Sequence, residues 1–218
     1  SRRRFIPAYR MKEANMEDII NKIKRYRPVL IDGYAESFNL LARYLENKKI
    51  DINGLKSIIS SAQTLPENSR NIIEKNFGCK VFDKYGAREF SGIAYECGYG
   101  VHHICSESYI VEILKNGKPA KPGEMGEVVI TDLNNFCMPF IRYRLGDLAV
   151  AYDNTKKCKC GRGLLKLGDI SGRVQSIIVG TDNQYLPSSF FLHFLKDLGH
   201  IVKQFQIIQE ERGSINLK

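Results

Sequence analysis

The sequence has no run of about 18 apolar residues, the length that a membrane-spanning helix needs. Its basic start, SRRRFIPAYR, is not followed by the apolar segment of a signal peptide. It also has no internal repeat and no low-complexity segment. These absences exclude a membrane-spanning helix and a repeat array, and the missing export signal favours a cytoplasmic location, where thiols stay reduced.

Acidic residues are fewer than basic ones, with 24 aspartates and glutamates against 33 lysines and arginines in 218 residues. The formal net charge of +9 favours an anionic partner, such as nucleic acid, anionic lipid or a phosphate-bearing small molecule. The basic residues are scattered, however, and no aromatic stacking platform of the RNA-binding kind is present. The distribution therefore argues against a nucleic-acid-binding module.

The first ninety residues alternate between helical and strand-like patterns. Helices are predicted over residues 15–26, with Asn15 as N-cap, and over 36–48 and 66–78. A short apolar run predicts a buried strand over residues 27–34, and further strands are predicted over 55–62 and 79–86. This alternation predicts an α/β fold with a mainly parallel sheet covered by helices.

The pattern then changes to β-type segments joined by Gly, Pro and Asn turns. They cover residues 108–114, 126–133, 138–147 and 148–153, and they predict an antiparallel or barrel-like part. After Arg173 the sequence predicts a hairpin over 174–187, a helix over 188–199 and two strands over 201–218 that meet at a turn at Gly213.

Two short motifs carry chemistry. In FDKYGAREF (82–90) a strand ends at a Tyr85-Gly86 turn, and Glu89 follows. Ligands of α/β sheets bind at the carboxyl ends of strands, so an aromatic ring, a glycine and a carboxylate there would suit a nucleotide and its metal. The alternative is a plain turn with a surface ion pair between Arg88 and Glu89.

The second motif is IRYRLGDLAV (141–150), in which Gly146-Asp147 follows a β run. A tight turn is predicted there. Its carboxylate can accept two hydrogen bonds from a vicinal diol, as carboxylates do with ribose. An ordinary β-turn aspartate is the alternative.

Taken together and in order, the motifs resemble the adenylate-forming (AMP-binding) enzyme superfamily. The nearest branch is that of the phenylacetate–coenzyme A ligases and their capsule-polysaccharide-biosynthesis (CapK-type) relatives. The residues that carry the resemblance are 85–89, 123–131, 142–147 and 172–173, within a match over about residues 27–200.

The resemblance implies a fold and a domain division. The chain would be the C-terminal half of an adenylate-forming core, an α/β sheet subdomain plus a β-rich subdomain, over residues 1–172. Part of the small α+β lid domain would follow over residues 173–218.

The resemblance also assigns roles. The residues matching those near the adenylate are Ser61, Ala62, Gln63, Tyr85 and Gly86. Arg88 departs from the family, which usually has Thr or Ser there, and is expected to face a phosphate. Asp147 matches the acceptor of the ribose hydroxyls, and Arg173 matches a cation near the ribose and α-phosphate. Glu89 matches the carboxylate that helps to hold Mg²⁺.

The reaction implied by the resemblance has two steps. A carboxylic acid reacts with ATP to give an acyl-adenylate, and a thiol, usually that of coenzyme A, then displaces AMP. The isolated chain is not expected to complete adenylation, because the family's Ser/Thr/Gly-rich phosphate loop has no match in it. Two other interpretations stay open, a non-catalytic nucleotide-binding remnant and a zinc-containing nucleic-acid-binding module.

The six cysteines raise a separate question. Cys79 and Cys137 lie in apolar contexts and are expected to be buried. Cys158 and Cys160 share one short loop, and YECGYGVHHIC (95–105) supplies further candidate ligands. We predict a structural zinc site formed by Cys97, His103, Cys158 and Cys160, with His102 and Cys105 as alternatives to His103. A loop with reduced thiols and a hydrogen-bonded histidine is the competing interpretation.

Overall fold

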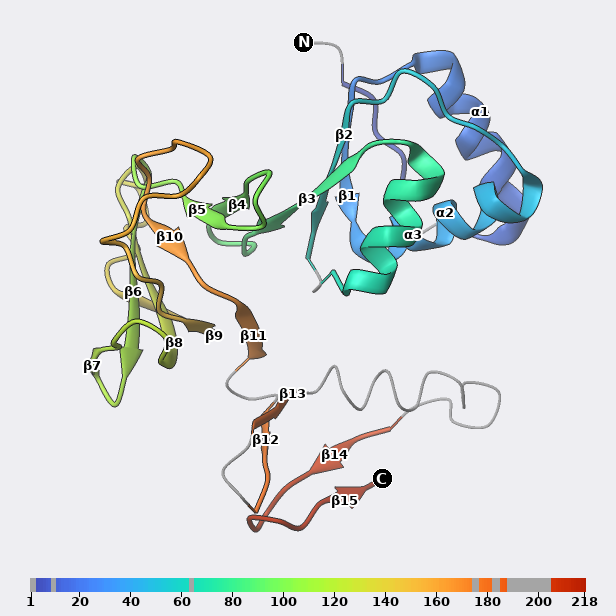
Figure 1. Ribbon diagram of the computed structural model, residues 1–218. Coiled ribbons are helices and arrows are strands. Elements are labelled where there is room, and N and C mark those ends of the chain that lie inside the picture. The colour runs from blue at the N-terminus through green and yellow to red at the C-terminus, as the bar shows by residue number, and fades with distance from the viewer. Residues whose placement is uncertain (1–2, 9–10, 63–64, 174–176, 182–184, 188–204) are drawn as a thin grey trace. The chain divides into compact units, whose positions relative to one another are not determined.

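The computed structural model describes residues 3–8, 11–62, 65–173, 177–181, 185–187 and 205–218 (Figure 1). The chain forms two compact units. The first comprises Ser1–Ser106 and Thr155–Lys166, and the second comprises Glu107–Asn154 and Leu167–Lys218. The predicted division into a core over 1–172 and a lid over 173–218 remains a prediction.

A six-stranded sheet organises the first unit, in the order β1-β2-β3-β4-β5-β10. Its strands are β1 (Leu30–Tyr34), β2 (Ser57–Ser61), β3 (Lys80–Tyr85), β4 (Ala94–Glu96), β5 (His102–Ile104) and β10 (Lys166–Leu167). The first three are parallel, whereas β4 is antiparallel to both β3 and β5. The predicted parallel sheet is thus present, and a short antiparallel hairpin extends it. The strand expected over 27–34 was predicted to be buried, which is wrong, because the residues of β1 at this edge of the sheet are exposed or half-buried.

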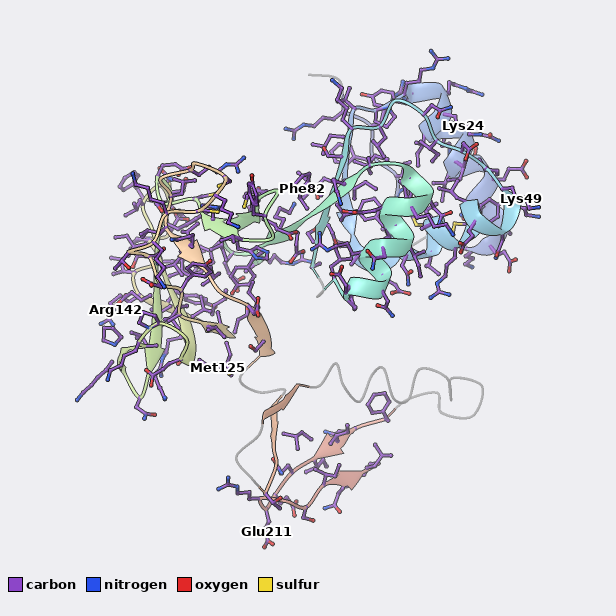
Figure 2. All side chains as sticks on the ribbon, viewed as in Figure 1. Lys24, Lys49, Phe82, Met125, Arg142 and Glu211 are labelled. Carbon is purple, nitrogen blue, oxygen red and sulfur yellow. The ribbon has the colours of Figure 1, made fainter. Side chains whose placement is uncertain are left out.

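Helices cover the parallel strands, and two of them also connect these strands in the chain, whereas the first helix precedes β1 (Figure 1). They are α1 (Met16–Tyr26), α2 (Ala35–Lys48) and α3 (Glu67–Phe77), preceded by a 3₁₀ turn at Glu13–Asn15. Their apolar sides form one core with the strands, in which Phe38 of α2 meets Phe77 of α3 edge to face at 6.3 Å between ring centroids. Lys24 and Lys49 lie on the helical side of the unit in Figure 2.

Local signals set the helix ends. Pro66 stands at the N-cap of α3, and Gly78 ends the helix with a φ of 64°, a conformation that glycine adopts without steric cost. Asn15 occupies the N-cap position of α1 as predicted, but its side chain does not cap that helix. Its Oδ1 instead accepts a hydrogen bond from the Lys12 backbone N–H at 2.9 Å.

The second unit is built from antiparallel strands, as the sequence predicted. Its five-stranded sheet has the order β11-β9-β8-β6-β7. The strands are β6 (Tyr109–Lys115), β7 (Lys118–Pro119), β8 (Met125–Asp132), β9 (Tyr143–Val150) and β11 (Ile170–Arg173). Two antiparallel pairs follow, β12 (Ile177–Val179) with β13 (Tyr185–Pro187) and β14 (Ile207–Ile208) with β15 (Asn216–Leu217). They confirm the predicted hairpin and the predicted final strand pair.

One prediction for this unit was wrong. Gly146 and Asp147 do not form a turn between two strands, because β9 runs through them without interruption. The register of β8 against β9 shifts between Glu127 and Val129, opposite these residues, and Gly146 has a φ of 79°. A glycine at positive φ serves a β-bulge as well as a turn, so the motif did not distinguish the two.

Three further expectations concern single segments. The predicted helix over 188–199 lies outside the described residues. Cys79 is half-buried and burial raises its pKa to about 11, whereas Cys137 is exposed and not buried as expected. None of the helices in the described part of the chain has the length and apolar character needed to cross a bilayer.

Candidate functional site

The carboxyl ends of β2 and β3 bring together most of the residues that we expected near an adenylate. The two strands are parallel and in register, with Ser61 beside Lys84 at their ends. Ser61 donates its hydroxyl to the Gly33 carbonyl at 3.2 Å, which joins the ends of β1 and β2. Ala62 then leaves the strand with a φ of 70°, unusual for a residue with a side chain. Gln63 lies outside the described residues.

A compact loop follows β3. Tyr85 is 8% exposed, and its carbonyl accepts a hydrogen bond from Ile93 N–H at 2.8 Å, which closes the loop. Gly86 packs so closely inside it that a Cβ atom there would overlap the Ser91 carbonyl oxygen. Ser91 itself has a φ of 51°. The backbone of this loop is therefore fixed by close contacts that only glycine permits at position 86.

Arg88 and Glu89 lie at the exposed part of the same loop. Mg²⁺ is usually held by one or two carboxylates together with water and substrate phosphates. A single exposed carboxylate beside the end of a parallel strand fits that requirement. Arg88 places a guanidinium next to it in the sequence, a group of the kind that binds phosphate oxygens.

The second unit contains the other two residues that we expected at the nucleotide. Asp147 lies on β9 with 9% of its surface exposed. Arg173 is the last residue of β11, and its backbone pairs with that of Asp147 across the antiparallel ladder. The structure thus places these two positions side by side within one sheet.

The predicted metal ligands converge in the first unit. Cys97, His103, Cys158 and Cys160 each offer one ligand atom, and these atoms lie within 4.8 Å of one another. Cys97 Sγ is 3.9 Å from Cys158 Sγ, and Cys160 Sγ is 3.2 Å from His103 Nε2. Cys97 and His103 are buried, and the two loop cysteines are half-buried. Their role as metal ligands remains a prediction that this geometry favours.

The two residues predicted as alternatives to His103 make contacts outside the cluster. His102 alternates with His103 along β5, and its Nε2 lies 3.3 Å from Asp83 Oδ2 on β3. Cys105 follows β5, where its backbone N–H donates to the Ile93 carbonyl at 3.0 Å. Among the described residues, the group of converging ligand atoms includes neither.

The environment favours the metal-binding protonation state at two of the four cluster residues, His103 and Cys160. At Cys158, by contrast, a backbone hydrogen bond that would lower the pKa of the thiol is outweighed by burial and by hydrogen bonds with the side chains of Cys160 and Cys97, which raise it. Burial lowers the pKa of the His103 imidazole, and the nearby charges of Arg162 and Lys166 act in the same direction, against the backbone of Leu164. Burial would raise the pKa of the Cys160 thiol, but hydrogen bonds from Arg162 and the neighbouring thiols outweigh it and lower the pKa to about 7. A neutral imidazole and an accessible thiolate are the forms that bind a metal.

Sequence reasoning missed an ion pair that lies beside this cluster. Arg70 on α3 donates Nη2 to both carboxylate oxygens of Glu96, at 3.1 and 2.9 Å. The Glu96 side chain is 9% exposed. No spacing rule connects a helix arginine with a carboxylate in a later hairpin, although the glutamate directly before Cys97 gave a local hint.

Comparison with known proteins agrees with this architecture. CapK of Staphylococcus aureus is 27% identical over 212 residues, which cover 97% of this chain and 46% of CapK. Phenylacetate–coenzyme A ligase of Thermus thermophilus is 24% identical and matches 89% of this chain and 45% of the enzyme. No protein-family model matches the chain.

Solved structures show the same fold. A 2-hydroxyisobutyryl-CoA ligase, crystallised with 2-HIB-AMP and CoA, matches with a TM-score of 0.72 and 18% identity. The match covers 95% of this chain and 49% of that one. An O-succinylbenzoate coenzyme A synthetase from Bacillus subtilis, in complex with AMP, matches with a TM-score of 0.64 and 17% identity over 93% of this chain and 43% of that one. The expected fold class is confirmed.

Residues, fold and relatives agree. The chain is similar in sequence to CapK and to phenylacetate–coenzyme A ligases and has the fold of the adenylate-forming CoA ligases, and it spans about half the length of the curated relatives it matches.

Proposed function

We propose that this chain supplies the adenylate-binding part of an ATP-dependent acid–thiol ligase. The main support is the similarity to phenylacetate–coenzyme A ligases over 89% of the chain, with the motif residues at the carboxyl ends of β2 and β3. Ligands of α/β folds bind at such strand ends. The proposed partners are a small carboxylic acid, ATP or AMP with Mg²⁺, and coenzyme A, and the proposed location is the cytoplasm.

In the proposed reaction, a carboxylate oxygen of the substrate bonds to the α-phosphorus of ATP. The bond from that phosphorus to the bridging oxygen breaks, and pyrophosphate leaves. The thiolate of coenzyme A then bonds to the acyl carbon of the adenylate, and AMP leaves with the electrons of the broken C–O bond. Mg²⁺ would supply charge neutralisation at the phosphates when bound.

The residues of the first unit would bind the base and the phosphates. Ser61 and Ala62 would lie along the adenine, together with Gln63, and the loop at Tyr85 and Gly86 would border it. Glu89 would contribute the carboxylate ligand to Mg²⁺, and Arg88 would face a phosphate. The exposure of both side chains suits contact with a charged, solvent-facing triphosphate.

The second unit would bind the sugar. The Asp147 carboxylate would accept hydrogen bonds from the two ribose hydroxyls, and Arg173 would place a cation near the ribose and the α-phosphate. The adjacent register positions of the two residues support a shared role. Arg173 would also begin the proposed lid domain over residues 173–218. A structural Zn²⁺ ion at the Cys/His cluster completes the proposed cofactor set.

Direct binding measurements test the proposal. We expect the chain to bind AMP, and to bind a non-hydrolysable phenylacetyl-adenylate analogue more tightly, in isothermal titration calorimetry. A single-stranded oligonucleotide serves as the discriminating ligand. Steeply salt-dependent binding of the oligonucleotide, without binding of AMP, would contradict the proposal and favour a nucleic-acid module. AMP binding without tighter binding of the acyl-adenylate would favour a nucleotide-binding remnant.

A further inference from the structure

The Cys/His cluster has dimensions that suit one tetrahedral metal ion. Zn–S bonds of about 2.3 Å place two sulfurs about 3.8 Å apart in a tetrahedral site, and a sulfur and a nitrogen about 3.6 Å apart. The observed separations are 3.9 Å for Cys97 Sγ and Cys158 Sγ, and 3.2 Å for Cys160 Sγ and His103 Nε2. Three soft sulfurs and one imidazole are donors that favour zinc over Mg²⁺ or Ca²⁺.

The charges near the cluster are also consistent with a zinc ion bound by three thiolates. A dication, three thiolates and a neutral imidazole sum to a net charge of −1. Lys166, only 5% exposed, and Arg162 lie close enough to act on His103, and Arg162 hydrogen-bonds Cys160. The Lys166 ammonium also donates to the Lys156 carbonyl, on the loop that carries the two cysteines. A buried lysine and a nearby arginine place positive charge beside a cluster whose net charge with zinc would be negative.

The cluster is joined to β3 through the residues that precede two of its ligands. Glu96 is the last residue of β4 and directly precedes Cys97, and His102 precedes His103 on β5. Because neighbouring side chains alternate along extended backbone, each of these two ligands has beside it a residue aimed elsewhere. Both of these neighbours bind Asp83 of β3.

The Glu96 carboxylate extends the pairing of β4 with β3 beyond the backbone ladder. The ladder consists of Lys84 with Tyr95 and Tyr85 with Ala94. At the next position Glu96 Oε2 accepts the Asp83 backbone N–H at 2.7 Å. From the other side, the His102 Nε2 atom lies 3.3 Å from the Asp83 carboxylate.

Arg70 completes this connection. Its Nη2 binds the Glu96 carboxylate, and its Nη1 donates to the Val81 carbonyl of β3 at 2.7 Å. The arginine therefore holds helix α3, strand β3 and the cluster hairpin in one arrangement. Two residues beyond Asp83, β3 ends at Tyr85 and enters the loop that carries Glu89.

We infer that a Zn²⁺ ion bound by Cys97, His103, Cys158 and Cys160 is a structural staple, and that Glu96 is the positioning residue through which it fixes the end of β3. The inference deepens the proposed function, because the segment so fixed is the proposed adenylate loop. The zinc ion itself would take no part in the chemistry, since four protein ligands leave no open position for a substrate.

The metal itself is tested by stoichiometry. Wild-type chain prepared in zinc-replete medium should carry one zinc ion per chain, measured by inductively coupled plasma mass spectrometry. Cys158→Ser should lose it, whereas Cys137→Ser, which changes an exposed cysteine outside the cluster, should keep it. If Cys158→Ser does not fold, Co²⁺ exchanged into the wild type should give the absorption of a tetrahedral thiolate site. A zinc-free wild type, or an octahedral Co²⁺ spectrum, overturns the inference.

The positioning role is tested by hydrogen exchange, which needs no nucleotide. Removing zinc with a chelator should raise amide exchange over residues 80–93 by about tenfold or more while α1 stays protected. Glu96→Gln should show that faster exchange with zinc still bound. Glu67→Gln is the matched control, because Glu67 also faces Arg70, at 4.0 Å, but its side chain is 81% exposed.

The possible results distinguish the zinc staple, the role of Glu96 and the proposed function from one another. Unchanged exchange over residues 80–93 after chelation, or equal loss of protection in α1, overturns the staple. Wild-type exchange in Glu96→Gln overturns the role of Glu96. A chain that binds zinc and responds as expected, yet binds no AMP, contradicts the proposed function and leaves the staple standing.

Discussion

Asp147 and Arg173 are register partners on the adjacent antiparallel strands β9 and β11. Each strand has an irregularity near this pair. Gly146, directly before Asp147, has a φ of 79°, and the register of β11 shifts between Ile170 and Gly172. Irregular strand pairing of this kind is over-represented next to active sites.

Asp147→Asn should weaken AMP binding by about tenfold or more. The carboxylate can accept hydrogen bonds from both ribose hydroxyls, and hydrogen bonds to a charged group contribute about 1.5–3 kcal/mol. Calorimetry with AMP measures the change. Asp51→Asn, at an exposed position in the first unit, should bind AMP as the wild type does. Equal affinities for Asp147→Asn and the control would remove Asp147 from the proposed site.

The elements that were predicted well are those whose signals are local. The stripe of Ile19, Ile20 and Ile23 fixes both the presence and the buried face of α1. Gly78 stops α3 because Gly78 itself takes the left-handed conformation that ends the helix. Such patterns need no knowledge of the rest of the chain, so sequence alone was enough.

The features that escaped prediction depend on distant partners. Arg70 and Glu96 are 26 residues apart and meet only because α3, β3 and β4 pack together. Strand alternation separates His102 from His103, and the prediction chose His103 with the alternatives left open, because the pattern does not say which face holds the cysteines. The Gly146 bulge was missed for a similar reason, because the partner strand β8 determines whether a glycine makes a turn or a bulge.

Gly86→Ala should destabilise the first unit and abolish AMP binding. An added Cβ would overlap the Ser91 carbonyl oxygen, a backbone atom that cannot move without opening the loop. We expect a loss of about 1–3 kcal/mol in the free energy of unfolding, as for other overpacked positions, measured by urea denaturation. Gly98→Ala is the control, because open space surrounds that glycine. Similar stabilities of the two variants would show that the loop is less constrained than its contacts indicate.

Phe77→Ala should lower the free energy of unfolding by about 3–5 kcal/mol. Phe77 is 1% exposed and meets Phe38 edge to face, so truncation removes buried apolar surface and leaves a cavity between α2 and α3. Phe136→Ala provides the matched comparison, because that ring is 87% exposed in the second unit. A small effect of Phe77→Ala in denaturant titrations would mean that the core collapses around the lost ring.

The ionised Glu74 carboxylate should stabilise the protein at neutral pH, and this stabilisation should be lost in acid. Burial alone would raise the pKa of its carboxyl, but Lys80 and the Val81 backbone N–H bind the charged form and lower the pKa below 4.5. A lowered pKa in the folded state means that the stabilisation is present above about pH 4.5 and is lost as the pH falls through the folded value. Glu74→Gln should therefore lower the free energy of unfolding by about 1 kcal/mol at neutral pH, the contribution of a typical hydrogen bond, with the difference from wild type shrinking in acid.

Urea titrations of both proteins between neutral and acidic pH measure this difference. Glu67→Gln is the control, because the Glu67 side chain is 81% exposed, and it should leave the wild-type pH dependence unchanged. If the free energy of unfolding of Glu74→Gln lies below that of the wild type by the same amount at all pH values, the contacts with Lys80 and Val81 do not depend on the carboxylate charge.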